Sequence, residues 1–275
     1  MDIKLIAMDL DGTLLDSRKN LSPENLYALE RAAGRGVHIV PCTGRFYTAI
    51  PEMIRNLPFV RYAITINGAV VYDAKEDRVI SQTAMPLERG LQILDWCAGL
   101  GVAYDCYIGS KGYMFKGHMD HIEDYLNSSV YCDLIRKMRI PVDDLRSFVK
   151  NLGLPVQKIQ IFTKNREILK NGRDYISGHF PDLIATSSLN NNLEINAANA
   201  NKGTALKALA AHLGIKIGQT MAFGDGGNDL PMIQAAGVGV AMANGLPELK
   251  KEASITTLSC DGSGVAYAIN RLLFS

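Results

Sequence analysis

Two aspartates that could do chemistry lie close to the amino terminus. Asp9 and Asp11 are two residues apart, and Gly12 and Thr13 follow them directly. A carboxylate beside a bound metal ion can attack phosphorus and form an aspartyl-phosphate, so Asp9 is a candidate nucleophile. Asp11 is placed to give a proton to the leaving oxygen and later to take one from the attacking water. The pair therefore predicts phosphoryl-transfer chemistry.

A second acidic stretch lies near the carboxyl end of the chain, at residues 224–229. It contributes Asp225 and Asp229. Joined in space to the first pair, these carboxylates would repel one another unless a cation lay between them. Oxygen ligands select a hard ion, and Mg²⁺ suits a site that also keeps waters and a substrate phosphate. We therefore expect a Mg²⁺ site that includes Asp9, Asp11, Asp225 and Asp229.

Groups that could hold a phosphate occur in two other stretches. Thr43 supplies a hydroxyl, and the backbone amides of the turn formed by Gly44 and Arg45 supply further donors. Lys202, at the start of an expected helix, brings a point charge and the favourable end of that helix dipole. Because phosphoryl transfer depends on donors around the non-bridging oxygens, these positions are candidate phosphate contacts.

Each stretch alone also has a structural interpretation. Asp11 and Gly12 form a pair that is common in hairpin turns. The stretch at 224–229 begins like a dinucleotide-binding loop, but Asp229 stands where the third glycine of that fingerprint belongs, and two carboxylates would repel a pyrophosphate. The combination of stretches, rather than any one of them, indicates a phosphate site.

The reactive residues follow predicted strands. A buried apolar strand is expected over residues 4–8 and ends at Asp9. Strand and helix alternate along both ends of the chain, which favours a parallel sheet covered on both faces. Ligands bind at the carboxyl ends of such strands, so we expect the stretches to converge on one crevice. The other expected strands span 37–40, 63–66, 220–223 and 238–242, and the expected helices span 23–34, 46–56, 204–213, 230–236, 247–253 and 264–273.

The length of 275 residues predicts two domains, because single domains usually hold about 100–200 residues. Between about residues 85 and 190 the apolar runs become shorter and tyrosines cluster. Residues 156–162 alternate strictly enough to suggest a strand with one wet face. We therefore expect an α/β core formed by residues 1–84 and 190–275, with an α+β domain, residues 85–189, inserted into it.

Composition limits the partners and the compartment. Hydrophobic residues make up 47% of the chain, and 29 Lys and Arg balance 28 Asp and Glu, so no overall field draws it to nucleic acid or to anionic lipid. No apolar run approaches the roughly 20 residues that would span a bilayer. The five cysteines are scattered, without a Cys-x-x-Cys pair. These features predict a cytoplasmic protein, a monomer or a small homo-oligomer, with a small-molecule partner.

The order of these stretches resembles that of the haloacid dehalogenase (HAD) superfamily of phosphatases, and within it the Cof-type group. Its four motifs are similar to Asp9-x-Asp11-Gly12-Thr13, Thr43-Gly44-Arg45, Lys202-Gly203 and Gly224-Asp225-x-x-Asn228-Asp229. The resemblance spans the whole chain, and the insertion lies where this group carries an α/β cap. It implies a Rossmann-like core with a mobile cap that closes over the site and sets substrate specificity.

The resemblance also implies roles for individual residues. Asp9 would be the nucleophile and Asp11 the general acid and base, with Lys202 as a third catalytic residue. Mg²⁺ would be held by Asp9, the backbone carbonyl of Asp11 and Asp225, with Asp229 acting through water. Phosphate contacts would come from Leu10, Thr43, Gly44, Arg45, Lys202 and Asn228. Residues 259–262 depart from the run expected there, which leaves their contacts open.

Members of this group usually hydrolyse small phosphorylated metabolites, often sugar phosphates, so the resemblance implies a Mg²⁺-dependent phosphatase of that kind. A phosphomutase is the nearest alternative, because the same aspartyl-phosphate can be passed to another sugar hydroxyl. A signalling phosphoacceptor would use similar residues to store the phosphate, but the large insertion and Asp11 weigh against it. A metabolite-binding protein without turnover has no need of a nucleophile beside a metal.

Overall fold

The computed structural model describes residues 2–187 and 190–274, and it divides into two compact units. The first is formed by the chain up to Gln82 and from Asn201 onward, and the second by Thr83–Ala200. The second unit therefore extends past residue 189, where its end was expected. The physical reason is that β11 (Asn192–Ala197) pairs with β9 and β10 in the sheet of the second unit.

The first unit contains a parallel sheet whose strand order is β14-β13-β12-β1-β2. β1 lies between β12 and β2, with Met8 opposite Phe223 on one side and Pro41 on the other. The predicted parallel sheet is thus confirmed, and its carboxyl ends share one edge. The strands are β1 (Leu5–Met8), β2 (His38–Pro41), β12 (Thr220–Gly224), β13 (Val238–Ala241) and β14 (Ile255–Thr256).

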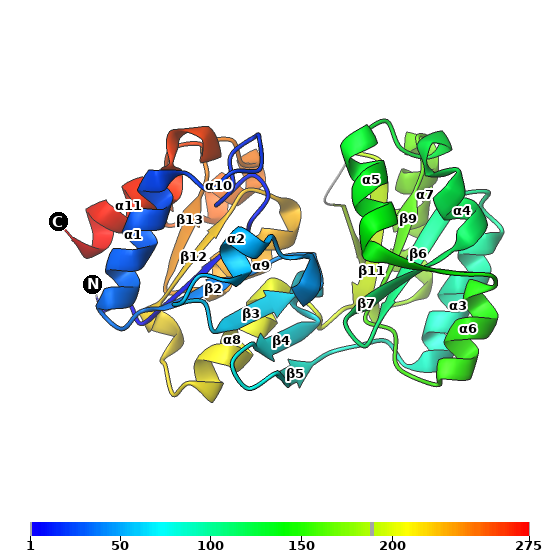
Figure 1. Ribbon diagram of the computed structural model, residues 1–275, viewed down its shortest axis with the longest axis horizontal. Coiled ribbons are helices and arrows are strands. Elements are labelled where there is room, and N and C mark those ends of the chain that lie inside the picture. The colour runs from blue at the N-terminus through cyan, green and yellow to red at the C-terminus, as the bar shows by residue number, and fades with distance from the viewer. Residues whose placement is uncertain (1, 188–189, 275) are drawn as a thin grey trace. The chain divides into compact units, whose positions relative to one another are not determined.

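Helices cover both faces of this sheet (Figure 1). On one face, α1 and α11 pack against side chains such as Ile6 and Phe223. On the other face, α8, α9 and α10 pack against Leu5, Ala7 and Ala222. The alternation of the β1 side chains between two apolar layers explains why the whole strand is apolar. The helices are α1 (Pro23–Gly34), α8 (Lys202–His212), α9 (Leu230–Ala235), α10 (Pro247–Glu252) and α11 (Gly264–Leu273), and the short 3₁₀ turns η4 (Ile217–Gln219), η5 (Gly227–Asp229) and η6 (Cys260–Gly262) lie between them.

A buried asparagine joins the first and last helices of this unit. Ser22 caps α1 by accepting a hydrogen bond from the Asn25 amide, 3.2 Å away. The Asn25 side chain, which is fully buried, donates to Leu14 O at 3.1 Å and accepts from the amide of Ala266 in α11 at 2.9 Å. One amide group thereby satisfies the backbone of two distant segments.

The segment after β2 differs from the expected helix over residues 46–56. It forms two short turns, η1 (Tyr47–Ala49) and α2 (Glu52–Arg55), separated by Ile50 and Pro51 in extended conformations. A residue that precedes proline avoids the helical region, so Pro51 ends the first turn at Ile50. The expectation of one continuous helix was wrong for this reason.

The strand expected over residues 63–66 is present but belongs to a separate antiparallel sheet of order β3-β4-β5. A parallel bridge between Cys42 and Ile64 links β3 to the end of β2. The elements are β3 (Tyr62–Thr65), η2 (Ile66–Gly68), β4 (Val70–Asp73) and β5 (Arg78–Gln82).

The second unit is built on a six-stranded sheet of order β10-β11-β9-β6-β7-β8, in which only the β7–β8 pair is parallel. Helices α3, α6 and α7 bury one apolar face of it. Its strands are β6 (Ala103–Ile108), β7 (Lys111–Phe115), β8 (Arg139–Val142), β9 (Lys158–Phe162), β10 (Leu183–Thr186) and β11, and its helical elements are α3 (Leu87–Ala98), α4 (Lys116–Asp120), η3 (Ile122–Asp124), α5 (Ser129–Met138), α6 (Leu145–Leu152) and α7 (Arg166–His179).

The polar side of β9 corrects a sequence-based expectation. Lys158 and Gln160 alternate with apolar residues as predicted, but their side chains are buried rather than wet. Lys158 pairs with Glu194 of β11 at 3.2 Å, so a charged partner on the next strand compensates the buried ammonium.

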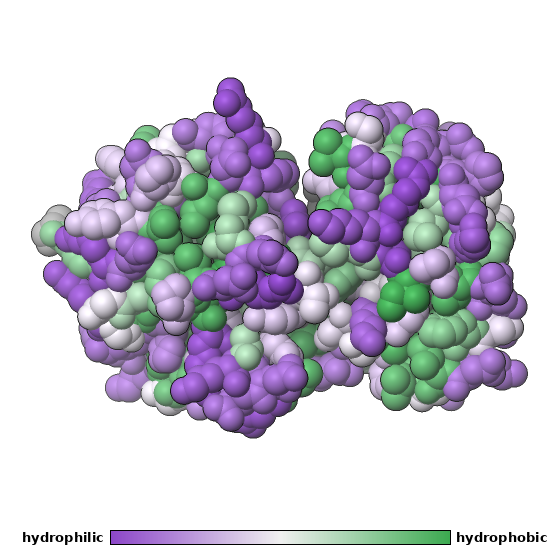
Figure 2. All heavy atoms as spheres, viewed as in Figure 1, coloured by the Kyte–Doolittle hydropathy of each residue, from purple (hydrophilic) through white to green (hydrophobic). Residues whose placement is uncertain are grey.

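The surface is mixed in character. Figure 2 shows hydrophilic residues over much of the viewed face of each unit, with apolar residues interspersed among them. None of the helices within residues 2–187 and 190–274 is long and apolar enough to cross a membrane.

Replacing Asn25 by alanine tests the link between the first and last helices. Asn25→Ala leaves Leu14 O and the Ala266 amide buried without their partner, so we expect the free energy of unfolding to fall by about 1–3 kcal/mol. Urea unfolding measures the change. Asn56→Ala, at an exposed asparagine of the same unit, is the control and should cost less than about 0.5 kcal/mol. Equal effects of the two substitutions would contradict the bridging role.

Candidate active site

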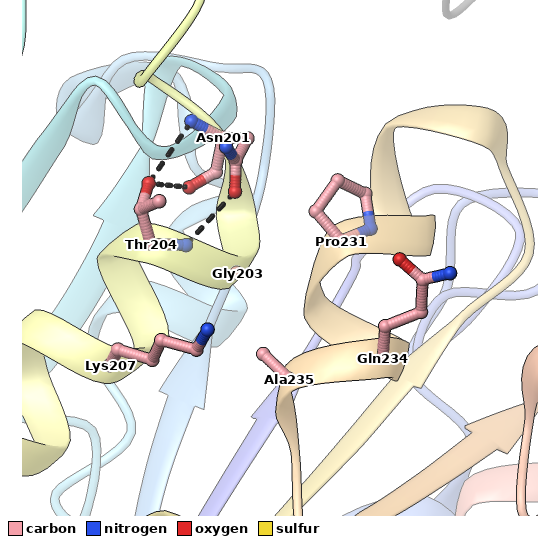
Figure 3. A pocket seen from close by; sticks show the side chains of 7 residues that line it. All are labelled: Asn201, Gly203, Thr204, Lys207, Pro231, Gln234 and Ala235. Atoms are coloured by element: carbon pink, nitrogen blue, oxygen red, sulfur yellow. Dashed lines mark hydrogen bonds between the residues drawn. The ribbon is translucent and has the colours of Figure 1, made fainter.

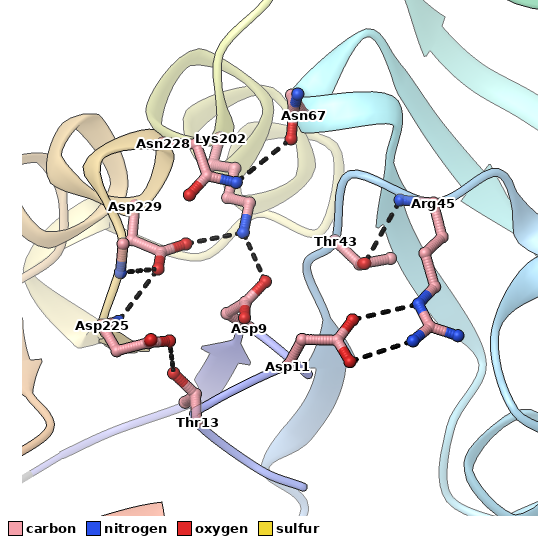
Figure 4. Close-up of polar contacts among 11 residues, drawn as sticks. Asp9, Asp11, Thr13, Thr43, Arg45, Asn67, Lys202, Asp225, Asn228 and Asp229 are labelled. Carbon is pink, nitrogen blue, oxygen red and sulfur yellow. Dashed lines mark hydrogen bonds and ion pairs between the residues drawn. The ribbon is translucent and has the colours of Figure 1, made fainter. Parts of the chain in front are cut away.

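The carboxyl edge of the parallel sheet brings together residues from both ends of the chain (Figure 4). Asp9 directly follows β1, and its amide donates to Phe223 O at 3.0 Å, which continues the pairing with β12. Asp225 directly follows β12. Because β1 and β12 are parallel neighbours in register, the two carboxylates leave the sheet side by side.

Three of the four predicted acidic residues form a cluster. Asp9, Asp225 and Asp229 each offer a carboxylate oxygen, and these atoms all lie within 4.8 Å of one another. The ammonium of Lys202 is fully buried and lies 2.6 Å from Asp9 Oδ1 and 2.6 Å from Asp229 Oδ1. Three carboxylates against one ammonium leave the cluster negative. An oxygen-only donor set with excess negative charge fits a hard divalent cation such as Mg²⁺.

Short hydrogen bonds hold the second acidic stretch in place. Asp229 Oδ2 accepts from the amides of Asp225 and Gly226, both at 2.9 Å. Asp225 Oδ1 accepts from the Thr13 hydroxyl at 2.8 Å. Gly12 permits this approach, because it has a φ of +87° and an added Cβ would lie 2.5 Å from Asp225 Oδ2. The glycine of the first stretch is therefore required both by its positive φ and by close packing against Asp225.

The electrostatics of the cluster favour binding of positive charge. Burial raises the pKa of Asp9 to about 8, although the Lys202 ammonium acts in the opposite direction. Burial and the charge of Asp229 raise the pKa of Asp225 to about 6. Burial alone would lower the pKa of Lys202, but Asp229 and Asp9 raise it well above its ordinary value. Lys202 is therefore a permanent cation, and the remaining repulsion lies among the carboxylates.

Asp11 lies outside the carboxylate cluster and is paired with two cations. Its carboxylate accepts from Arg45 Nε at 3.0 Å and Arg45 Nη2 at 2.9 Å, and Lys19 Nζ lies 2.8 Å from Oδ1. Burial alone would raise the pKa of Asp11, but the charges of Arg45 and Lys19 lower it below its usual range. The two aspartates of the first stretch thus differ in environment: Asp9 lies buried among other carboxylates, whereas Arg45 and Lys19 hold Asp11 as a carboxylate.

The predicted phosphate contacts lie around the same edge. Thr43 is the second residue after β2, and its hydroxyl accepts a hydrogen bond from the Arg45 amide at 3.2 Å. Asn228 donates to the side chain of Asn67 at 3.2 Å. Leu10 has a fully buried side chain in the apolar core, so only its backbone is available to a phosphate. Gly44 packs against Asn67, whose Oδ1 would lie 2.8 Å from an added Cβ.

Sequence reasoning gave no role to Asn67 or to Lys19. Asn67 has a left-handed backbone with φ of +56°, and its amide donates to Thr43 O at 3.1 Å. Its signals were the Asn-Gly pair after a strand, since both residue types tolerate that conformation, and the similarity of residues 67–69 to the family. The sequence does not mark Lys19 as a site residue, because a lysine in a polar turn is most often an ordinary surface residue.

A separate pocket lies between α8 and α9 (Figure 3). It has a volume of about 270 Å³ and is lined by residues that include Asn201, Lys207 and Gln234. Asn201 caps α8 and exchanges hydrogen bonds with Thr204, also in the lining. None of the clustered carboxylates lines this pocket, so it is distinct from the acidic site.

A sequence profile of the haloacid dehalogenase-like hydrolases matches residues 6–269. The chain belongs to this family. It is 32% identical over 287 residues to the phosphatase YwpJ of Bacillus subtilis, with 98% of this chain and 100% of the relative covered. It is also 32% identical to a 5-amino-6-(5-phospho-D-ribitylamino)uracil phosphatase, YwtE, of the same organism, with 98% of each covered.

Solved structures agree with this membership. A haloacid dehalogenase-like hydrolase from B. subtilis superposes with a TM-score of 0.85 at 31% identity, covering 98% of this chain and 100% of its own. The family and the enzyme class expected from the motifs, a HAD phosphatase, are thereby confirmed. So is the parallel-sheet core with an additional sheet domain.

The buried lysine offers a test of the cluster that does not depend on activity. Lys202→Met removes the cation and leaves Asp9 and Asp229 buried without it, so we expect a loss of about 3–5 kcal/mol in the free energy of unfolding without added metal. Urea unfolding measures it. Lys207→Met removes an exposed lysine from the same helix and should change stability by less than about 0.5 kcal/mol. A Lys202→Met protein as stable as Lys207→Met would show that the ion pairs contribute nothing.

Proposed function

We propose that this chain is a Mg²⁺-dependent phosphatase that hydrolyses phosphomonoesters of small metabolites, in particular sugar phosphates, through an aspartyl-phosphate on Asp9. The observation that carries the proposal is that, in the part of the chain that the structure describes, one oxygen of the Asp9 carboxylate accepts a hydrogen bond and the other does not. Among the described residues only Lys202 donates to it, at Oδ1. The other oxygen is left for attack on phosphorus, beside a cluster suited to a divalent cation.

The acidic cluster is the proposed Mg²⁺ site. Asp9, Asp225 and the backbone carbonyl of Asp11 would be direct ligands, and Asp229 would act through water. That assignment agrees with the hydrogen bonds of Asp229, whose two oxygens already accept from Lys202 and from two backbone amides. Bound Mg²⁺ supplies positive charge that offsets the repulsion between Asp9 and an incoming phosphate.

In the first half-reaction, a carboxylate oxygen of Asp9 forms a bond to phosphorus as the bond from phosphorus to the ester oxygen breaks. For this step Asp11 must carry a proton, against the lowering of its pKa by Arg45 and Lys19, and it gives that proton to the leaving oxygen. The Thr43 hydroxyl, the amides of Gly44 and Arg45, Lys202 and Asn228 are the proposed donors to the non-bridging oxygens, with the backbone of Leu10 beside them. Donors fixed before the reaction stabilise the charge of the transition state.

In the second half-reaction, water forms a bond to phosphorus and the bond between phosphorus and Asp9 breaks. The proton of the water passes to Asp11, which became a carboxylate in the first half-reaction. The net result is an alcohol and inorganic phosphate, with both aspartates returned to their starting state.

The proposed substrate class is supported by a relative and not by the site. The YwtE phosphatase acts on a compound whose phosphate is carried by a ribityl chain, a sugar alcohol. A small phosphorylated metabolite with several hydroxyl groups is therefore the proposed substrate here. The second unit, residues 83–200, is the proposed specificity domain, and the cytoplasm remains the predicted compartment.

Asp9→Asn should abolish phosphate release, because the amide is neither a nucleophile of comparable strength nor a metal ligand of the same charge. We expect a loss of at least about 10³-fold, in line with the removal of a nucleophile. The assay is release of inorganic phosphate from a panel of phosphorylated sugars and sugar alcohols in the presence of Mg²⁺. Asp174→Asn, at an exposed aspartate, should keep full activity.

The same panel separates the alternatives. Isomerised sugar in place of free phosphate would identify a phosphomutase, and a stable phosphoprotein without release would identify a phosphoacceptor. Turnover by Asp9→Asn at the rate of the unmodified chain would remove Asp9 as the nucleophile.

Magnesium should stabilise the protein by binding the native state only. At a concentration of a hundred times its Kd, Mg²⁺ should raise the free energy of unfolding by about 2.7 kcal/mol. Chelator should reverse the gain and stop phosphate release. Asp225→Asn removes one proposed ligand and should weaken the Mg²⁺-dependent gain. An equal gain in both proteins, measured by thermal unfolding across a Mg²⁺ titration, would exclude Asp225 as a ligand.

A further inference from the structure

Asp11 is held by cations from two different loops. Arg45, which follows β2, contacts both carboxylate oxygens through Nε and Nη2. Lys19, which lies in the loop after β1, contacts Oδ1 at 2.8 Å. The Asp11 side chain remains 31% exposed, so water can reach it. These three groups form what we call the Asp11 clamp (Asp11, Lys19 and Arg45).

Counting donors shows what the clamp does to the two oxygens. Each carboxylate oxygen offers about two lone-pair positions to donors. In the described structure Oδ1 accepts from Arg45 and from Lys19, so both of its positions are filled, whereas Oδ2 accepts from Arg45 Nε only. The clamp therefore leaves one acceptor position open, and Lys19 is the residue that confines it to Oδ2.

The backbone of Lys19 is strained to reach this position. Its φ is +66°, a conformation that residues other than glycine rarely adopt and that costs on the order of 1 kcal/mol. Asp16 compensates, since its Oδ1 accepts from the amides of Arg18 at 2.9 Å and Asn20 at 2.8 Å. The Ser17 amide donates to Asp261 Oδ1 at 2.8 Å, which fixes the loop to η6. Such support on both sides indicates a loop built to hold one conformation.

Arg45 is fixed independently of the loop. Its Nη1 donates to Ala49 O at 3.2 Å, so the edge that carries Nε and Nη2 is turned toward Asp11. The fork of a guanidinium sets the plane of the carboxylate that it binds. Lys19 then adds a second cation at Oδ1.

We propose that Lys19 is a positioning residue for the second half-reaction of the proposed phosphatase. By filling the last position on Oδ1, it leaves Oδ2 as the oxygen that can accept from the attacking water. The bond from water oxygen to phosphorus forms, the bond from phosphorus to Asp9 breaks with its electron pair returning to Asp9, and the proton of the water passes to Asp11 Oδ2. Lys19 touches neither substrate nor phosphorus in this role, and the inference rests on the phosphatase function proposed above.

A substrate-binding role for Lys19 would give a different kinetic result. Loss of a contact to the incoming phosphate lowers kcat/KM, which reports the steps up to formation of the phosphoenzyme. Loss of positioning slows breakdown of the phosphoenzyme. It leaves kcat/KM unchanged for para-nitrophenyl phosphate, because the para-nitrophenolate can leave without a proton from Asp11. The two roles are therefore separable in one set of measurements.

The experiment compares the unmodified chain with Lys19→Met, Lys19→Arg and Arg18→Met. Arg18 is the matched control, because it is an exposed cation in the same loop and only its amide is engaged in the Asp16 turn. Each protein is loaded with radiolabelled para-nitrophenyl phosphate in Mg²⁺, chased with unlabelled compound, and quenched with acid to follow the phosphoprotein. Steady-state kcat and KM for the same compound and the melting temperature are measured alongside.

We expect Lys19→Met to slow decay of the phosphoprotein by about tenfold, since a reacting group misplaced by an ångström can cost on the order of a hundredfold. Its kcat/KM and melting temperature should match those of the unmodified chain. Lys19→Arg should restore most of the decay rate, and Arg18→Met should decay normally.

Unchanged decay in Lys19→Met would overturn the positioning role, as would equal slowing in Arg18→Met. A fall in kcat/KM with normal decay would assign Lys19 to substrate binding instead. If the unmodified chain forms no phosphoprotein and releases no phosphate, the phosphatase proposal itself fails, and this inference fails with it.

Discussion

The buried ammonium of Lys202 lies between two carboxylates, Asp9 and Asp229, that would otherwise repel each other at the edge of the sheet. The rest of the site follows from this like-charge constraint. Asp225 brings a third carboxylate within reach and is held by the Thr13 hydroxyl, while two backbone amides hold Asp229. Even so, the cluster keeps an excess of negative charge, and it is this excess that makes a divalent cation and a phosphate compatible with the site.

Much of the fold could be predicted because its signals are local. Apolar runs of strand length that end at polar residues located the strands of the parallel sheet, and caps such as Ser22 located α1. The predictions failed where a distant contact or a single residue determines the local structure. Pro51 breaks the expected helix, and β11 joins the second unit through pairing that its own sequence does not reveal. Likewise, Lys158 is buried because Glu194 lies on the neighbouring strand, which periodicity alone cannot show.

The sequence predicted those site residues that lie in its recognisable polar stretches at strand ends and helix starts. The structure brings Asp9, Lys202, Asp225 and Asp229 together, as convergence at one sheet edge requires. Their roles in catalysis remain proposals. What the sequence could not show was pairing through space. Lys19 lies in a polar turn like many others, and only the fold places its ammonium against a carboxylate eight positions earlier in the chain.

The division of the first unit between the two ends of the chain has a consequence for its synthesis. Asp9 and Lys202 are 193 positions apart, and Thr13 and Asp225 are 212 positions apart. A ribosome therefore makes the first carboxylates long before their counter-charge and before β12, the strand beside β1. The second unit is continuous in sequence and is complete by Ala200. Because domains generally fold as units during synthesis, the second unit can fold on the ribosome while the site is still in pieces. The acidic site thus forms last, when nearly the whole protein has been made.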